Sequence, residues 1–263
     1  MRRGRQRPNK PGKAPWRGKP RHAPRQESPD RVALFGVHAV EAALANPKRS
    51  ILRVRATENA AQRLAPLLAK RGIKPEPAIP RDLDKMLGAD AVHQGILLEA
   101  EPLPPVSLEE VDANGILLVL DQLTDPQNVG AALRSAAAFG AAGLVMTERH
   151  SPPLQGALAK AASGALDIVP VILVKNLSQA LAELGERGVM RVGLSEEASE
   201  PLESSPLARP LALVLGAEGK GLRQLTREHC DRLCRISTKS ALASLNVSNA
   251  AAVALHWSSL NAR

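Results

Sequence analysis

The chain has 263 residues, with 35 Lys or Arg against 26 Asp or Glu, which gives a formal charge of +9. This length allows two modest domains that each bury a core, and the basic balance favours a polyanionic partner. No apolar run approaches the roughly 18 residues of a membrane span, and no secretory core is present, so we expect a cytoplasmic protein. Cys230 and Cys234 lack the spacing of a zinc or redox motif, so no metal is expected.

The excess positive charge lies at the N-terminus. Residues 1–31 contain 11 basic and 2 acidic residues, a net charge of +9, so residues 32–263 are formally neutral. This segment is rich in Pro, Gly and Arg and poor in aliphatic residues, so burial cannot offset the entropy of ordering it. We expect a disordered basic arm that either only aids solubility or attracts RNA phosphates without sequence preference.

Residues 32–101 show the mixed apolar periodicities of a small α/β domain. The predicted elements are a helix over 37–45, a strand over 51–56, a helix over 59–70, a short helix around 82–87 and a strand over 95–100. Prolines, acidic residues and a closing Asn-Gly then mark a linker, which we place at 102–113.

Residues 114–263 begin with an apolar run over 116–120, which is typical of a strand buried on both faces of a parallel sheet. Helices are then predicted over 126–139, 154–162, 177–186 and 245–260, and strands over 144–146, 168–171, 190–194, 211–215 and near 236. This alternation predicts a mostly parallel α/β sheet with helices on both faces. Ligands bind such sheets at the carboxyl ends of the strands, so the loops there are the candidate sites.

The first candidate loop, residues 120–140, leads into a helix that Asp125 can cap and in which Pro126 suits the first position. Caps and an alanine-rich interior explain most of this segment without a function. Two side chains are left over: Asn128 in the first turn, and Arg134, whose guanidinium could cover a buried site or bind phosphate. A surface ion pair is the alternative for Arg134.

The second candidate loop follows a buried strand and reads GAEGKG over residues 216–221. It lacks the Lys-Ser/Thr pair of a phosphate loop, and a Rossmann fingerprint would follow the first strand of the sheet instead. Its glycines allow the backbone to approach a ligand, and free backbone groups can read an adenine edge. On spacing alone, a plain tight turn is the simpler interpretation.

The third candidate loop, residues 236–248, ends in Ser-Leu-Asn-Val-Ser at the start of an alanine-rich helix. Either Ser244 or Asn246 could be the N-cap of that helix, which would explain both residues without a function. The alanines allow the close backbone packing that a crowded helix or a subunit contact requires.

Taken in order and spacing, the three loops resemble motifs one, two and three of the SPOUT methyltransferases, specifically the TrmH/SpoU family of RNA ribose 2′-O-methyltransferases. The matching residues are Asn128, Gly130 and Arg134 of N-x-G-x-x-x-R, the glycine-glutamate loop 216–219 and S-L-N-V-S over 244–248. FGVHAVEAAL over 35–44 and AVHQGILLEA over 91–100 are similar to the family's N-terminal substrate-binding domain. The resemblance covers most of residues 33–260.

The resemblance implies a C-terminal α/β-knot domain with a deep trefoil knot, and a homodimer in which two subunits build each active site. It also implies S-adenosylmethionine bound in a bent shape by the knot loops, without a metal. The residues implied to hold this cofactor are Leu194, Gly216, Gly219, Ile236 and Leu245. Where members often have Pro-Met-x-Gly, this chain has Ser-Thr-Lys-Ser over 237–240, which predicts a different path for the cofactor loop.

By the resemblance, Arg134 is the central catalytic residue. We expect it to donate to the ribose 2′-oxygen and stabilise the developing alkoxide, because a guanidinium is costly to deprotonate. Ser244 and Asn246 are implied to position the ribose or relay its proton, and Asn128 to hold either Arg134 or the nucleotide. Glu218 is either a base or a structural partner of a knot-loop amide.

The N-terminal domain is expected to choose the RNA, and the scarcity of aromatic residues favours recognition of shape and phosphates. His93 and Gln94 could contact RNA or complete a turn, and we favour the turn. The two-domain form is similar to enzymes that modify a guanosine of 23S ribosomal RNA, free or in an assembling large subunit. The alternatives are ribose methylation of tRNA and a catalytically silent RNA-binding ribosome assembly factor.

Overall fold

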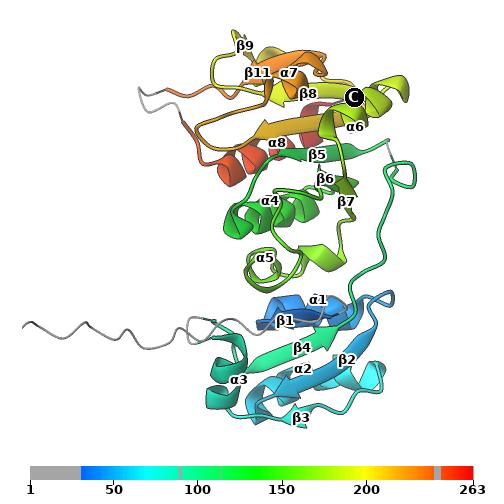
Figure 1. Ribbon diagram of the computed structural model, residues 1–263, viewed down its shortest axis with the longest axis vertical. Coiled ribbons are helices and arrows are strands. Elements are labelled where there is room, and N and C mark those ends of the chain that lie inside the picture. Colours follow the sequence, from blue (N-terminus) through cyan, green and yellow to red (C-terminus); the bar gives the residue numbers. More distant parts are fainter. Residues whose placement is uncertain (1–30, 89–90, 113, 240–243, 263) are drawn as a thin grey trace, which may run out of the picture.

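The computed structural model describes residues 31–88, 91–112, 114–239 and 244–262 and shows two units, each built on one sheet (Figure 1). The first sheet has four strands in the order β1-β4-β2-β3, and the second has seven in the order β7-β6-β5-β10-β8-β11-β9. Every pairing in the seven-stranded sheet is parallel. The predicted α/β class is confirmed, whereas residues 1–30 of the expected basic arm lie outside the described residues.

The N-terminal unit packs its helices against a mixed sheet. Its elements are β1 (Val32–Phe35), α1 (Val37–Ala45), β2 (Ile51–Ala56), α2 (Glu58–Lys70), β3 (Glu76–Pro77), α3 (Pro80–Leu87) and β4 (Ile96–Ala100). Strand β4 pairs antiparallel with both β1 and β2, and Leu34, Val54 and Leu98 from these strands are buried in one core. Strands β1 and β3 were not predicted, because so short a strand carries too little periodicity.

The C-terminal unit alternates strands and helices along the chain. Its elements are β5 (Ile116–Asp121), α4 (Pro126–Ala138), β6 (Gly143–Thr147), α5 (Gly156–Ala161), the 3-10 helix η1 (Ala165–Asp167), β7 (Val171–Val174), α6 (Leu177–Glu186), β8 (Met190–Leu194), β9 (Glu200–Pro201), the 3-10 helix η2 (Leu202–Ser204), β10 (Leu211–Gly216), α7 (Gln224–Glu228), β11 (Arg232–Arg235) and α8 (Val247–Asn261).

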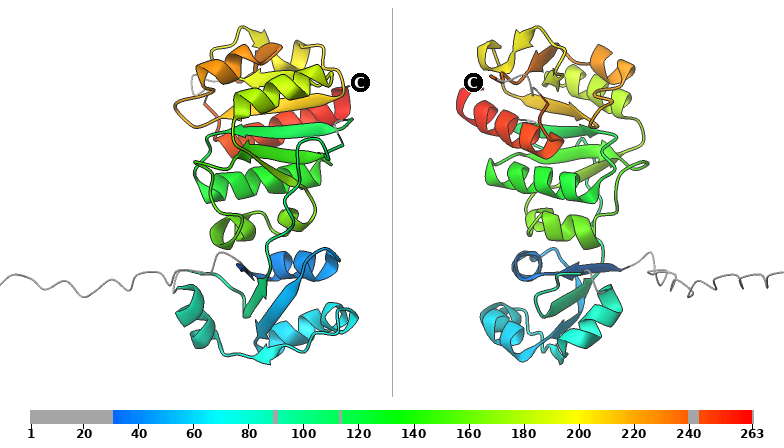
Figure 2. Two further views of the ribbon diagram at one scale, coloured as in Figure 1. Left: turned by 45° about the vertical axis from the view of Figure 1, so that its right-hand side comes forward. Right: turned by 90° about the vertical axis from the view of Figure 1, so that its left-hand side faces the viewer.

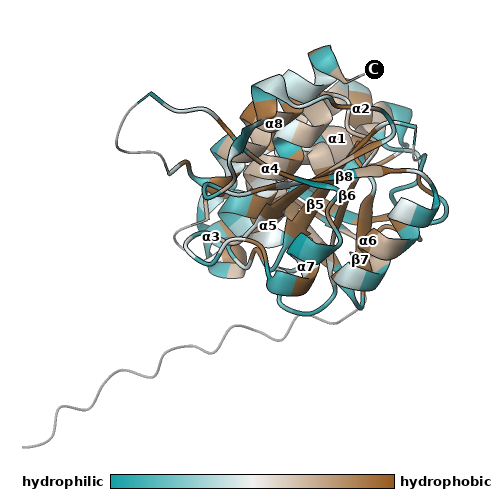
Figure 3. Cartoon of the chain, turned by 90° about the horizontal axis from the view of Figure 1, so that it is seen from above, coloured by the Kyte–Doolittle hydropathy of each residue, from teal (hydrophilic) through white to brown (hydrophobic). Residues whose placement is uncertain are grey.

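Strand β5 has all six of its residues buried, because helices cover both faces of the sheet, whose strands are hydrophobic in Figure 3. Leu118 and Leu120 belong to the core that includes α4, α5 and α8, while Leu117 and Val119 belong to the core that includes α6. This alternation is what the unbroken apolar run predicts. It places helix α4 between α5 and α8, where the first and third motifs can meet.

Two predicted strands are misplaced. The strand expected over 168–171 begins at Val171, because Ala165–Asp167 form a 3-10 turn and Ile168 points outward, 67% exposed. The strand expected near residue 236 ends at Arg235, one residue earlier. Both errors have one cause: a short apolar stretch does not show which of its residues face the core.

The trefoil knot implied by the resemblance stays a prediction. The third motif follows residues 240–243, which lie outside the described residues. In the part of the chain that the structure describes, no helix combines the length and the apolarity needed to cross a bilayer.

Candidate active site

The carboxyl ends of three neighbouring strands carry three of the five residues expected to hold the cofactor. Leu194 ends β8, Gly216 ends β10, and Ile236 follows β11 directly. The strand order β10-β8-β11 places these ends side by side, and the register aligns Leu194 with Leu215 on one side and with Cys234 on the other. The structure therefore brings Leu194, Gly216 and Ile236 together along one edge of the sheet.

The glycine loop after β10 is a tight turn. The backbone N–H of Gly221 donates to the carbonyl of Ala217 at 2.8 Å, and Gly219 and Gly221 have φ angles of 74° and 63°. At Gly216, a Cβ atom would lie 2.1 Å from the carbonyl carbon of Gly221, so no side chain fits there. The tight-turn interpretation is confirmed, and this turn exposes residues Glu218 and Gly219 beside the strand ends.

A buried carboxylate fixes the far end of this loop. Asp121, at the carboxyl end of β5, is 1% exposed, and it accepts hydrogen bonds from Arg223 N at 3.0 Å and from Arg223 Nε at 2.7 Å. This pair ties the first strand to the segment before α7. This ion pair was not predicted from the sequence, although an acidic residue directly after a fully apolar run is a usable signal.

Glu218 joins the three motifs into what we call the amide–carboxylate cluster, formed by Asn128, Glu218 and Asn246. Its Oε1 atom accepts from Asn246 Nδ2 at 2.6 Å, from Val247 N at 3.2 Å and from Asn128 Nδ2 at 3.4 Å. Asn246 Nδ2 also donates to Asn128 Oδ1 at 2.9 Å. Glu218 is thus a structural partner of a backbone amide in the third motif, one of the two expected alternatives.

Asn246 is also the N-cap of α8. Its Oδ1 atom accepts from the backbone N–H of Ser248 at 2.9 Å and from the Ser248 hydroxyl at 2.6 Å. Ser244, the other candidate cap, is exposed two residues earlier, and Leu245 between them is half-buried. The capping role therefore falls to Asn246 and leaves the Ser244 hydroxyl at the surface of the loop.

Arg134 lies on α4, but apart from the amide–carboxylate cluster. It is exposed, and its Nη1 donates to the hydroxyl of Ser163 at a long 3.4 Å. It follows Asn128 by six residues, about 9 Å of helix rise and about a third of a turn away around the axis. Asn128 was expected to hold either Arg134 or the nucleotide; in this structure Asn128 bonds to Glu218 and Asn246, and Arg134 bonds to Ser163.

The loop after β11, where the chain departs from the family pattern, is held by Ser237. Its backbone N–H donates to Glu203 Oε1 at 3.1 Å, and its hydroxyl donates to Glu203 Oε2 at 2.9 Å. Burial raises the pKa of Glu203, but hydrogen bonds from Ser237 and from the Glu203 backbone, with the charge of Arg235, outweigh it and leave that pKa lowered. A proline could make neither of these hydrogen bonds.

His93 and Gln94 complete a turn in the N-terminal unit, as favoured. His93 is buried, and its Nδ1 accepts from Gly95 N at 3.0 Å while its Nε2 lies 3.1 Å from Asp84 Oδ1. Gln94 has a φ of 53°, and its side-chain oxygen accepts from Val37 N at 2.9 Å. The two side chains therefore have partners in the turn itself, on α3 and on α1.

Neither cysteine has the character of a nucleophile. Cys230 and Cys234 are free thiols, and burial raises the pKa of Cys230 to about 12 and that of Cys234 in the same direction. Among the described residues, no group of three His, Cys, Asp or Glu side chains could hold a metal.

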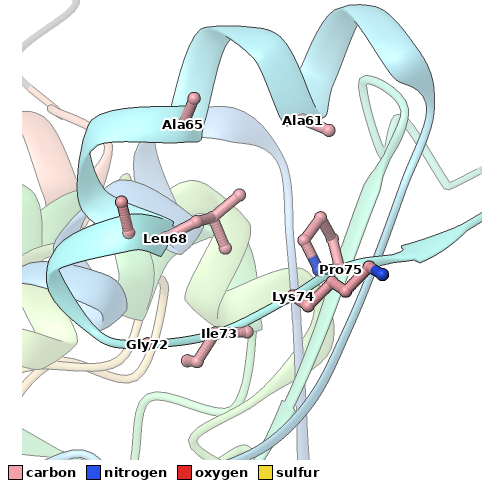
Figure 4. Close-up of a pocket in the computed structure, with 8 residues that line it drawn as sticks. Ala61, Ala65, Leu68, Gly72, Ile73, Lys74 and Pro75 are labelled. Carbon is pink, nitrogen blue, oxygen red and sulfur yellow. The ribbon is translucent and has the colours of Figure 1, made fainter.

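A hollow of about 410 Å³ lies far from the motifs, in the N-terminal unit. Figure 4 shows that Ala61, Ala65 and Leu68 of α2 line one side and the segment 72–75 lines the other. Lys74 is the one charged residue in this lining. Such a surface offers little beyond apolar contact and is a poor candidate for catalysis.

Two family models match the two units. The SpoU rRNA methylase family matches residues 115–256, and the RNA 2′-O ribose methyltransferase substrate-binding family matches residues 33–106. Relatives include the 23S rRNA (guanosine-2′-O-)-methyltransferase RlmB of Pseudomonas putida, 36% identical over 233 residues that cover 84% of this chain and 93% of that protein. The RlmB of Ralstonia nicotianae is 40% identical over 231 residues, which cover 84% of this chain and 92% of that protein.

Solved structures share the fold. The SpoU methyltransferase AviRb from Streptomyces viridochromogenes, in complex with AdoMet, superposes with a TM-score of 0.74 at 22% identity and covers 89% of this chain and 92% of that chain. The matched ranges, the relatives and the meeting of three motifs at one sheet edge agree with one another. The chain belongs to the SpoU rRNA methylase family and carries that family's RNA 2′-O ribose methyltransferase substrate-binding unit at its N-terminal side.

Proposed function

We propose that this protein transfers a methyl group from S-adenosylmethionine to the ribose 2′-oxygen of a guanosine in 23S ribosomal RNA. The observation that carries the proposal is the amide–carboxylate cluster, in which Glu218 bonds to Asn128 and Asn246 from motifs 90 and 28 residues away in the sequence. The relatives named as 23S rRNA guanosine methyltransferases, 36% and 40% identical, support this choice of substrate.

The strand ends fit S-adenosylmethionine. Leu194, Ile236 and Leu245 are half-buried aliphatic side chains that offer apolar surface to an adenine ring. Gly219 is exposed with open space around it, and Gly216 is half-buried at the end of β10. When bound, this cofactor supplies an electrophilic methyl group, so the protein has only to orient and activate the acceptor hydroxyl.

Arg134 is the residue proposed to act on the ribose 2′-oxygen. A guanidinium remains charged at neutral pH, so it stabilises the negative charge that develops on that oxygen by donating hydrogen bonds. Its exposure, and a long contact with Ser163 as its one hydrogen bond to the described residues, leave N–H groups for the substrate. The exposed Ser244 hydroxyl and the Asn246 amide hold the ribose, and Glu218 keeps Asn246 in place.

The proposal includes a homodimer in which each active site takes Arg134 from one subunit and the cofactor loops from the other. Two observations support it. Arg134 and Asn128 lie on different faces of α4, so one chain does not direct both toward the same point. Val253 and Leu260 on α8 are 43% and 70% exposed, and such apolar side chains suit a subunit interface.

We also propose a division of labour along the chain. Residues 32–101 select the RNA, 102–113 link the units, and 114–263 hold the cofactor and perform methyl transfer, while the arm 1–31 contributes non-specific attraction to phosphates. Because bacterial ribosomal RNA is made in the cytoplasm, the proposal includes a cytoplasmic location.

The test is to incubate the protein with methyl-labelled S-adenosylmethionine and unmodified 23S rRNA or total tRNA, and then to map the 2′-O-methyl positions. We expect label at one 23S guanosine and none with Arg134→Ala. Label confined to tRNA would replace the rRNA substrate with the alternative. No label on either RNA or on assembling large subunits, with RNA binding intact, would favour a silent assembly factor.

A further inference from the structure

Ser163 occupies a conformation that a serine rarely adopts. It follows α5 with a φ of 49°, in the left-handed region where glycine is the usual residue. Its hydroxyl accepts from Arg134 Nη1 at 3.4 Å and lies 3.5 Å from the carbonyl of Lys160, to which it donates. A glycine would fit this backbone better but would leave Arg134 without this partner.

The contact depends on how closely α5 approaches α4. A Cβ atom on Gly130, in the first motif, would lie 2.6 Å from both Ala161 Cβ and the carbonyl oxygen of Leu158. Gly130 therefore allows the two helices to touch through their backbones. This approach brings the end of α5, and with it the Ser163 hydroxyl, within reach of the guanidinium on α4.

The residues that follow Ser163 are fixed to the N-terminal unit, where Figure 2 shows α1 next to the α5–η1 region. Gly164 packs on α1 so closely that a Cβ atom there would lie 2.6 Å from Ala42 Cβ. Asp167, whose side chain is 2% exposed, accepts from Asn46 Nδ2 and from Arg49 Nε, both at 2.9 Å. The Arg49 side chain is 4% exposed. A buried carboxylate that accepts two hydrogen bonds leaves this segment little freedom to move.

We propose that Ser163 is a positioning residue for Arg134, and that the segment 163–167 fixes its hydroxyl relative to the N-terminal unit that receives the RNA. This inference rests on the proposed function for its catalytic consequence. Ser163 takes one N–H of the guanidinium and directs the remaining ones away from α5. The same short segment thus sets where the RNA-binding unit sits and where the catalytic guanidinium points.

The substitution Ser163→Gly tests this, because it removes the hydroxyl and suits the positive φ angle. We expect an unchanged or higher Tm, a kcat for RNA methylation lowered by about 3- to 10-fold, and an unchanged KM for S-adenosylmethionine. The matched control is Ser135→Ala on α4, next to Arg134. It also deletes a hydroxyl, but one that donates to Ala131 O at 3.1 Å, so kcat should stay within twofold of the wild type.

A second readout works without turnover. The ¹⁵Nε signal of Arg134, assigned with Arg134→Ala, should report a more ordered side chain in the wild type than in Ser163→Gly. An unchanged signal, or a changed signal with kcat within twofold of the wild type, overturns the proposal. A wild type that methylates no RNA refutes the proposed function, while the comparison of the two Arg134 signals still decides whether Ser163 positions the guanidinium.

Discussion

The amide–carboxylate cluster and Arg134, the two parts of the proposed active site, differ in how firmly they are held. The amide–carboxylate cluster is bound in several directions, because Glu218 Oε1 accepts from two amide side chains and from a backbone N–H at distances of 2.6 to 3.4 Å. Among the described residues, Arg134 has one hydrogen bond, the long one to Ser163, and it is exposed. The comparison indicates that the cluster sets the shape of the site, whereas Arg134 remains available for the substrate.

The largest effect should come from the loosely held part. Arg134→Ala removes the donor proposed for the developing alkoxide, and we expect kcat to fall by about 10²- to 10³-fold. Because the side chain is exposed, Tm should stay within about 1 °C of the wild type. Arg134→Lys keeps the charge but loses the planar donor set, and it should recover only a small part of the activity. Nearly full activity in the lysine variant would contradict a role in orientation.

Mixing two inactive variants tests whether the two parts act across subunits. Arg134→Ala and Asn246→Ala should each be inactive alone. When the two variants are refolded together in equal amounts, half of the dimers contain one copy of each. One of the two sites in such a dimer is intact, so about a quarter of the wild-type activity should return. A site built within one chain predicts no recovery. The control is a mixture of Arg134→Ala with wild type, analysed for dimer exchange by mass.

A smaller effect on kcat should show whether Glu218 is a structural hydrogen-bond partner or a general base. Glu218→Gln keeps a side-chain oxygen that can accept from Val247 N and Asn246, so a structural partner should lose less than about 10-fold in kcat. A general base would lose about 10²- to 10⁴-fold. The pH dependence of kcat, measured for both proteins, is the second readout, because only a base would contribute an ionisation that disappears in the glutamine variant.

The same distinction explains what could be predicted from the sequence. Periodicity and caps located nearly all helices and buried strands, and the resemblance to the family grouped Asn128, Glu218 and Asn246 with Arg134 and Ser244 in one site. The contacts between them could not be predicted, because they join loops brought together only by strand order. Ser163 lies 29 residues from Arg134, and its one local signal, a left-handed serine, exists only in the folded chain.

A few-fold effect on cofactor affinity is expected in the loop after β11, which Ser237 holds by hydrogen bonds to Glu203. Ser237→Ala removes the hydroxyl bond to Glu203 but keeps the backbone bond, and we expect S-adenosylmethionine affinity to fall by about 2- to 5-fold in a calorimetric titration. Ser204→Ala is the matched control, since its hydroxyl donates to Pro201 O nearby at 3.2 Å. Equal affinities for the two variants would show that the hydroxyl does not hold the loop.

The smallest effect is on thermal stability and comes from Asp231, which directly precedes β11 and bonds to Arg191 of β8. It accepts from Arg191 N at 2.7 Å and from Arg191 Nε at 3.0 Å, and hydrogen bonds from that side chain lower the pKa of Asp231 despite some burial. A carboxyl whose pKa is lower in the folded state stabilises the fold above its unfolded pKa, and this stabilisation is lost as the pH falls through the folded value. Asp231→Asn should therefore lower Tm by about 2 °C at pH 7, and by progressively less below about pH 4. A difference in Tm that persists unchanged down to about pH 2 would mean that the charge of Asp231 does not stabilise the strands and that its contribution is independent of ionisation.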